Sequence, residues 1–180
     1  MAMLIHLNGP SGVGKSTLAK RFSEDHPGTL NLDVDRVATM IGGWQHDFAA
    51  ALTPTRRLAV AMAETHLHNG GDVVMPQLIT RHDQVVLFED AAARAGAAFV
   101  EIALLVDPQE QTRRFFSRPG GTEHEDHIGR RIAARGGEEV LHRIHRHLLE
   151  YLASRPHPRR VPTHGTTPEQ SYNRLLAAIE

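Results

Sequence analysis

The sequence predicts an α/β fold in which helices cover both faces of a five-stranded parallel sheet, giving three layers. Short apolar runs alternate with longer segments whose apolar residues recur every three or four positions, as in amphipathic helices. Strands that alternate with helices form parallel sheets, because each helix carries the chain back to the start of the next strand. The chain has 180 residues, of which 41% are hydrophobic, enough for one substantial core. We therefore expect residues 1–180 to form a single domain.

The first half of the chain contains three of the expected strands. Each is a short apolar run that ends at turn-forming residues, as buried strands do. Thr53 is a suitable N-cap for a long helix, and Gly70 and Gly71 are suitable residues to end it. The expected order is a strand at 3–8, a helix at 15–26, a strand at 28–35, a helix at 36–41, a helix at 53–71 and a strand at 72–78.

The second half continues the alternation and adds a glycine-rich segment. Pro108 suits the first turn of a helix, and Thr166 or Thr167 can cap the last one. The charged segment 119–137 contains several glycines, and we expect it to be mobile. The expected order is a helix at 82–95, a strand at 97–107, a helix at 108–118, the mobile segment, a helix at 138–155, a strand at 159–164 and a helix at 168–180.

Composition narrows the classes of function. The formal net charge is −1, which argues against a nucleic-acid or acidic-membrane partner. The chain has no cysteine, so disulfides and thiolate metal sites are excluded. The longest apolar run, AFVEIALLV, is interrupted by Glu101 and is far too short to span a bilayer. We expect a soluble cytoplasmic protein, as a monomer or homodimer, that acts on a small molecule.

Residues 9–17 read GPSGVGKST and follow the first expected strand. The spacing of Gly9, four residues, Gly14, Lys15 and Ser16 matches the P-loop, or Walker A, pattern. Gly9, Gly12 and Gly14 allow the backbone to turn its N–H groups toward phosphate oxygens. The following helix begins there, and its N-terminus favours an anion.

This loop predicts binding of ATP together with Mg²⁺. Lys15 can reach the β- and γ-phosphates, and the Ser16 hydroxyl is a suitable Mg²⁺ ligand. We expect the nucleotide to contact Gly9, Ser11, Gly12, Val13, Gly14, Lys15, Ser16 and Thr17.

The second expected strand ends in NLDVDR, which places Asp33 and Asp35 two residues apart. In an extended segment such residues share a face, so both carboxylates would point into the crevice at the sheet's carboxyl edge. One would hold Mg²⁺ through a water, and the other would accept the proton of an attacking hydroxyl. The alternative is that one of them caps the helix that follows.

Other segments favour a kinase among the P-loop proteins. The Asn-Lys-x-Asp pattern of a GTPase does not occur, and the strand DVVMPQL does not end in the acidic pair of a larger ATPase. Over essentially its whole length the chain resembles P-loop small-molecule kinases, in particular the group of shikimate kinase, gluconate kinase, chloramphenicol phosphotransferase and the zeta toxins. The matching segments are GPSGVGKST, LDVDR, DVVMPQL and RRFFSRPGG.

The resemblance implies roles for several residues. Asp35 would be the catalytic base or hold the acceptor, and Asp33 would lie nearer the metal, which Ser16 also binds. Arg114 and Arg118 would clamp the phosphates and assist catalysis with Lys15. These arginines begin a lid, approximately residues 114–136. Arginines that close over a transferring phosphoryl group would stabilise its charge.

The lid and the acceptor site have further candidate residues. Hinges for the lid are expected at Gly120, Gly121 and Gly129, and phosphate contacts also from Arg113, Arg130 and Arg131. Trp44 could stack on an acceptor ring or belong to the core. We expect the acceptor to contact Asp33, Asp35, Arg36, Trp44, Gln77 and Arg81.

The 13 histidines invite a metal-site interpretation. His124 with His127, and His142 with His145, have suitable spacing. An exposed lid and a solvated helix explain them more simply, so Mg²⁺ is the metal we expect.

Together these features predict transfer of the γ-phosphoryl group of ATP to a hydroxyl of an antibiotic, sugar, nucleoside or hydroxy acid. The alternatives are a nucleotide or polynucleotide 5′-kinase and an ATP-binding regulatory module without catalysis.

Overall fold

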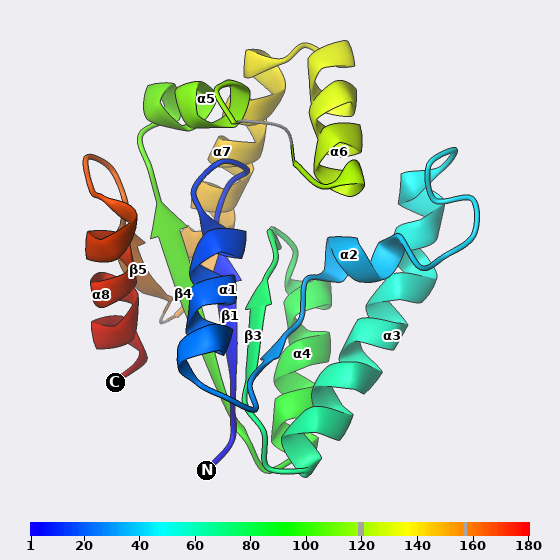
Figure 1. Ribbon diagram of the computed structural model, residues 1–180, viewed down its shortest axis with the longest axis vertical. Helices are drawn as coiled ribbons and strands as arrows, with labels where there is room; N and C mark the ends of the chain where they lie inside the picture. Colours follow the sequence, from blue (N-terminus) through cyan, green and yellow to red (C-terminus); the bar gives the residue numbers. More distant parts are fainter. Residues whose placement is uncertain (119–120, 157) are drawn as a thin grey trace.

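A five-stranded parallel sheet forms the centre of the protein. The computed structural model describes residues 1–118, 121–156 and 158–180. The strand order is β2-β3-β1-β4-β5, and every adjacent pair is parallel (Figure 1). The strands are β1 Met3–Asn8, β2 Leu30–Asn31, β3 Val73–Pro76, β4 Ala98–Leu105 and β5 Arg159–Pro162. The expected five-stranded parallel sheet is confirmed.

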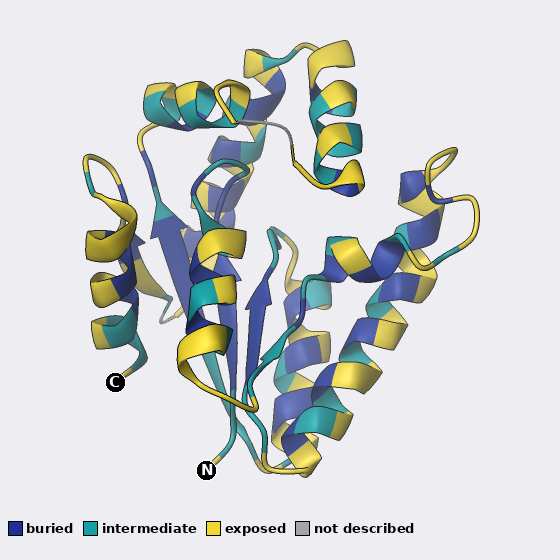
Figure 2. Ribbon diagram, in the orientation of Figure 1, coloured by how far each residue is buried: buried dark blue, intermediate teal, exposed yellow. Residues whose placement is uncertain are grey.

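Helices cover both faces of this sheet. One apolar core joins it to α1 and α8, and a second joins it to α3, α4 and α7. The buried residues lie on the sheet and on the inner faces of these helices (Figure 2). The helices are α1 Lys15–Asp25, α2 Val34–Ala38, α3 Phe48–His68, α4 His82–Arg94, α5 Pro108–Phe116, α6 Glu123–Ala134, α7 Glu138–Ser154 and α8 Pro168–Ile179.

Several predicted boundaries agree with the structure. Pro108 occupies the first turn of α5, and Thr167 caps α8 with a reciprocal Gln170 contact. Helix α3 ends before Gly70, whose φ of +83° favours glycine. The start of α3 was predicted too late, because Asp47 accepts a hydrogen bond from the Ala50 amide and begins the helix before Thr53.

The segment 119–137, for which the sequence predicted mobility and no helix, contains helix α6. Thr122 and Glu125 form a capping box that satisfies the first amides of this helix. Ile128 and Ile132 pack with Val140 and Leu141 of α7, which gives α6 an apolar face. Gly129 lies inside α6, and Gly120 is outside the described residues. In Figure 1, α5, α6 and part of α7 lie beyond the carboxyl ends of the strands.

In the part of the chain that the structure describes, no helix combines the length and the apolar character needed to cross a bilayer.

Candidate active site

The loop between β1 and α1 has the backbone conformation that its glycines permit. Gly12 and Gly14 have φ angles of +89° and +103°, in the region that other residues rarely adopt. A side chain at Gly12 would also meet the Gln111 carbonyl oxygen and the Phe115 amide, each 3.2 Å from its Cβ. Gly14 is the N-cap of α1, whose first turn holds no acidic residue. The loop therefore leaves the helix N-terminus suited to bind an anion.

Lys15 turns back onto this loop. Its Nζ donates hydrogen bonds to the carbonyl oxygens of Gly9 at 2.8 Å and Pro10 at 3.1 Å. Burial lowers the pKa of Lys15 to about 8, and nearby Arg118 adds to that effect, while Asp35 and Asp33 oppose it. The ammonium group thus lies in a poorly hydrated site. It can exchange its two carbonyl partners for phosphate oxygens when a nucleotide binds.

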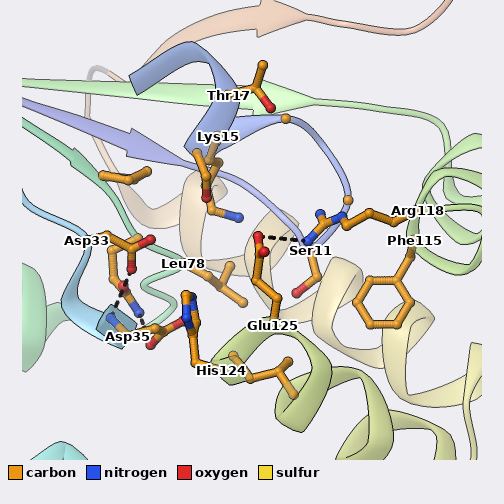
Figure 3. Close-up of a pocket in the computed structure, with 16 residues that line it drawn as sticks. Ser11, Lys15, Thr17, Asp33, Asp35, Leu78, Phe115, Arg118, His124 and Glu125 are labelled. Carbon is orange, nitrogen blue, oxygen red and sulfur yellow. Dashed lines mark hydrogen bonds and ion pairs between the residues drawn. The ribbon is translucent and has the colours of Figure 1, made fainter. Parts of the chain in front are cut away.

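A pocket of about 230 Å³ opens beside Lys15 at the carboxyl edge of the sheet (Figure 3). The P-loop forms one wall of this pocket, which we call the reaction pocket. The loops after β2 and β3 form the second wall, and α5 and α6 with their junction form the third. The first wall contributes Ser11, Gly12, Gly14, Lys15, Ser16 and Thr17, and the second contributes Asp33, Asp35, Gln77 and Leu78. The third wall contributes Phe115, Arg118, His124, Glu125 and Ile128.

The two aspartates meet in the reaction pocket, but the predicted geometry was wrong. β2 ends at Asn31, and Asp33 caps α2, its Oδ1 accepting from the amides of Asp35 at 3.1 Å and Arg36 at 3.3 Å. Asp35 therefore lies in the first helical turn instead of on a strand. The capping alternative is correct for Asp33.

The donor groups around Asp33 suit Mg²⁺. The Ser16 hydroxyl and the Asp33 carboxylate line the same pocket, and the capping bonds engage only one of the two Asp33 oxygens. Hard oxygen ligands with room for water are what Mg²⁺ prefers. The residues present thus fit the ion.

Asp35 is the pocket carboxylate whose pKa is raised. Burial raises the pKa of Asp35, and the nearby Asp33 carboxylate raises it further. Three neighbours act in the opposite direction: the Gln77 amide, which donates to Asp35 Oδ1 at 3.3 Å, and the charges of Lys15 and His124. A half-buried carboxyl with a raised pKa suits a proton acceptor.

The two predicted phosphate-clamping arginines lie in different surroundings. Arg118 lines the reaction pocket and donates to Glu125 Oε1 of α6 at 3.3 Å. Arg114 donates to Glu110 Oε1 and to the Thr163 carbonyl, each at 2.8 Å. It lines a second hollow of about 610 Å³, which continues from the P-loop toward Thr166, Pro168 and Ser171. We call this second hollow the outer pocket.

Three of the predicted acceptor contacts lie outside the reaction pocket. Arg36 is exposed, and Arg81 forms an exposed ion pair with Asp83 at 2.7 Å. Trp44 is 7% exposed and belongs to a small apolar cluster with Phe48. Its ring meets those of Phe48 and His127 edge-on. Of the predicted acceptor residues, the structure brings Asp33, Asp35 and Gln77 together.

His124 is a pocket residue that sequence reasoning missed. We expected it on an exposed lid, yet it is 7% exposed and faces the pocket near Asp35 (Figure 3). The Thr122 hydroxyl lies 2.8 Å from His124 Nδ1 and 3.1 Å from Glu125 Oε2, and in the His124 tautomer whose Nδ1 donates to Thr122, the hydroxyl donates to Glu125. Nε2 of a neutral His124 then has a free lone pair. The capping-box pattern around Thr122 could have revealed this helix start.

A buried polar cluster below the P-loop was also missed. The Asn8 amide is fully used: Oδ1 accepts from Gly9 N and Ile79 N, and Nδ2 donates to Ile79 O and Glu101 Oε1. Glu101 also accepts hydrogen bonds from Tyr151 and Arg155. This network joins the loops after β1 and β3 to β4 and α7, so it fixes the P-loop relative to the wall that carries Gln77.

His145, from the second expected histidine pair, has a side-chain partner. His145 was expected on a solvated face, but it is buried and its Nδ1 lies 3.0 Å from Gln111 Oε1. Burial lowers the pKa of His145. Across residues 1–118, 121–156 and 158–180, His, Cys, Asp and Glu side chains form no group of three or more that could hold a metal ion.

The fold and the loop define a P-loop α/β domain with a nucleotide-phosphate site. A family model described as an AAA domain matches residues 4–158, and the chain belongs to this family. A search of curated proteins finds no significant match.

Solved kinases share the fold. A sugar kinase from Janibacter is 15% identical, with a TM-score of 0.64, and 99% of this chain and 95% of that chain are covered. A gluconokinase from Sinorhizobium meliloti is 18% identical, with a TM-score of 0.59 and coverage of 97% and 90%. An APS kinase from Mycobacterium tuberculosis, solved with AMPPNP and APS, is 20% identical, with a TM-score of 0.61 and coverage of 99% and 97%.

Proposed function

We propose that the protein is an ATP-dependent phosphotransferase that moves the γ-phosphoryl group to a hydroxyl of a small polar molecule. The observation that carries this proposal is that Lys15 of the P-loop and the half-buried Asp35 line one pocket. A phosphate-binding cation and a proton acceptor are the two groups that such a transfer needs. The shared fold with solved small-molecule kinases supports the same class of reaction.

The reaction follows from the positions of these groups. The loop amides and Lys15 hold the phosphates of ATP, with the adenosine end in the outer pocket beside Arg114. The acceptor hydroxyl lies next to Asp35, and its oxygen attacks the γ-phosphorus as the bond to the β-phosphate oxygen breaks. Asp35 accepts the hydroxyl proton, and ADP leaves. Arg118 stabilises the negative charge on the transferring group.

The same pocket would hold the magnesium that accompanies ATP. Ser16 and Asp33 are the residues placed to bind it, Asp33 through the oxygen that the α2 cap leaves free. Bound there, Mg²⁺ neutralises phosphate charge.

His124 orients the acceptor in this proposal. Its Nδ1 is fixed by Thr122, and its Nε2 is available to accept a hydrogen bond from an acceptor hydroxyl. Because His124 lies in the first turn of α6, we infer that residues 114–136 act as a lid on a single domain and complete the acceptor site when they close.

The experiment that tests the proposal is an ATP-consumption screen over hydroxylated sugars, nucleosides, amino acids and antibiotics with Mg²⁺. The matched blanks are Lys15→Ala and Asp35→Asn, and products are checked by mass. One acceptor that raises ADP formation above both blanks, with a product heavier by one phosphoryl group, is the expected result. Tight ATP binding with equal background hydrolysis for every compound would contradict the proposal and indicate a nucleotide-binding module.

A further inference from the structure

The charges in the reaction pocket are divided between its two ends, and this division constrains the acceptor. We propose that the acceptor is a hydroxyl compound without an anionic group, either uncharged or carrying an amine. This inference rests on the proposed phosphotransfer and deepens it, because it names the chemical class that the acceptor end can bind.

The positive charges serve the phosphate end. Among the described residues that line the reaction pocket, Lys15 and Arg118 are the cationic side chains, apart from the titratable His124. Lys15 lies within the P-loop, and Arg118 also lines the outer pocket. When ATP is bound, both cations face its phosphates, and neither remains to neutralise a second anion.

The acceptor end is acidic and partly apolar. Asp35 brings a carboxylate to it, with Asp33 nearby, and the Glu125 carboxylate, which accepts from Arg118 at 3.3 Å, also lines the pocket (Figure 3). Leu78 and Ile128 add apolar surface. His124 lies beside the Asp35 carboxylate (Figure 3).

The arginines that could bind an anion lie elsewhere. Arg36 and Arg81 are exposed outside the pocket, and Arg81 is paired with Asp83. Arg130 lines a hollow between α5 and α6. Arg131 and Arg135 line another hollow, which adjoins the reaction pocket at Ser11 and Ile128, but neither arginine lines the reaction pocket itself.

An anionic acceptor would therefore be desolvated next to carboxylates of the same sign. A charge removed from water without a partner is strongly disfavoured, and a neighbouring like charge adds to the cost. A protonated amine would instead gain a carboxylate partner, and a neutral polyol would use Gln77, Asp35 and His124 as hydrogen-bonding groups.

A thiol probe tests this charge assignment without knowledge of the acceptor. Because the chain has no cysteine, Leu78→Cys introduces a unique thiol at the acceptor end, and Ala61→Cys provides an exposed control on α3. Each variant is treated with a cationic aminoethyl and an anionic sulfonatoethyl methanethiosulfonate of similar size. The reactions are run with Mg²⁺ and a non-hydrolysable ATP analogue bound, and the ratio of the two rates is the readout.

We expect the cation-to-anion rate ratio of L78C to exceed that of A61C by about tenfold or more, since charged clefts change local rates by such factors. Adding Glu125→Gln or Asp35→Asn to L78C should lower the ratio. A ratio equal to that of A61C would overturn the proposal. A rate ratio that neither substitution changes would also overturn the proposal, because the charge of the bound nucleotide alone would then determine the ratio.

An acceptor series gives the functional test. One set is glucosamine, glucose and glucuronate, which share a sugar ring and differ in charge. A second set is adenosine and AMP, which share a nucleoside. A third set is the acceptor found in the ATP-consumption screen together with its charged analogues. We expect the anionic member of each set to have at least about a hundredfold lower kcat/KM than the best member. A preferred anionic acceptor would overturn the inference. A cation-favouring thiol probe with no acceptor in any charge class would instead overturn the proposed phosphotransfer and leave the charge assignment standing.

Discussion

The side-chain amide of Gln77 donates a hydrogen bond of 3.3 Å to the Asp35 carboxylate, joining the end of β3 to the first turn of α2. Asp35 follows β2 and Gln77 follows β3, and these two strands are adjacent in the sheet. The contact therefore closes the second wall of the reaction pocket. It also stabilises the charged form of a carboxylate that burial and Asp33 otherwise disfavour.

The first prediction concerns the acid side of the pH–rate profile. Because the pKa of Asp35 lies above the ordinary aspartate value of 3.8, activity should fall as the pH drops through a range higher than that of an ordinary aspartate. Only the deprotonated form accepts a proton, so the loss is on the acid side. Asp35→Asn should lower kcat/KM by about 10² to 10⁴-fold. A profile whose acid side is unchanged in Asp35→Asn would show that another group is the base.

The second prediction uses the Gln77 contact itself. Gln77→Leu removes the hydrogen bond to the charged form, so the acid side of the kcat/KM profile should move to higher pH. At a pH where Asp35 is fully ionised, the decrease in kcat/KM should stay within about tenfold, the size expected for one hydrogen bond to a charged group. Gln84→Leu, on the first turn of α4 outside the reaction pocket, is the matched control. An acid side shifted equally by both variants would contradict the role of Gln77.

The third prediction concerns ATP binding at alkaline pH. The pKa of Lys15 is lowered to about 8 in the free protein, and phosphate binding needs its charged form. The Kd for ATP should therefore increase as the pH rises above about 8, by up to about tenfold per pH unit, and binding there should take up a proton. Calorimetric titration in buffers of different ionisation enthalpy measures both effects. Lys15→Arg keeps its charge over this range, so an equal pH dependence in that variant would rule out Lys15 as the source.

The fourth prediction concerns His124. His124→Ala should raise the KM for the acceptor by about ten- to a hundredfold, because the hydroxyl loses an oriented hydrogen-bond partner. The Kd for ATP should stay within about twofold of wild type, since the phosphates are held by the P-loop. His147→Ala, an exposed position on α7, is the matched control. A weakened ATP affinity with an unchanged acceptor KM would assign His124 to the nucleotide instead.

The fold could be predicted from the sequence because the central strands β1, β3 and β4 are local apolar runs. The P-loop could be predicted as well, since its glycines, Lys15 and Ser16 are consecutive and their spacing alone specifies the backbone. Asp33 and Asp35 were correctly predicted to line one pocket, but the predicted reason, that both lie on a strand, was wrong. The sequence NLDVDR does not show that pairing of β2 stops at Asn31, because that depends on the partner strand.

The missed residues depend on contacts between distant segments. His124 reaches the pocket because α6 packs on α7 through Ile132 and Val140, and charge-rich sequence gave little sign of a buried face. The polar network of Asn8 and Glu101 spans 93 residues of sequence. A glutamate inside an apolar strand was its one local signal, and Arg155 could be identified as the partner only in three dimensions.

The last prediction tests that network as a stabilising element. Glu101 is 6% exposed and accepts from Arg155 Nε at 2.8 Å, and Arg155 is also paired with Glu89. Arg155→Met leaves a buried carboxylate without its main cation, so urea denaturation should show a loss of about 3 kcal/mol in the free energy of unfolding. Arg81→Met, which breaks the exposed pair with Asp83, should cost less than about 1 kcal/mol.

The pH dependence of this stabilisation has a definite sign. Burial alone would raise the pKa of Glu101, but His6, Asn8, Tyr151 and Arg155 together lower it below the ordinary value of 4.5. The stabilisation is therefore full above about pH 4.5 and is lost as the pH falls further. Wild type should lose more unfolding free energy than Glu101→Gln between pH 5 and pH 3. Equal losses in the two proteins would mean that Glu101 is not held in its ionised form by this network.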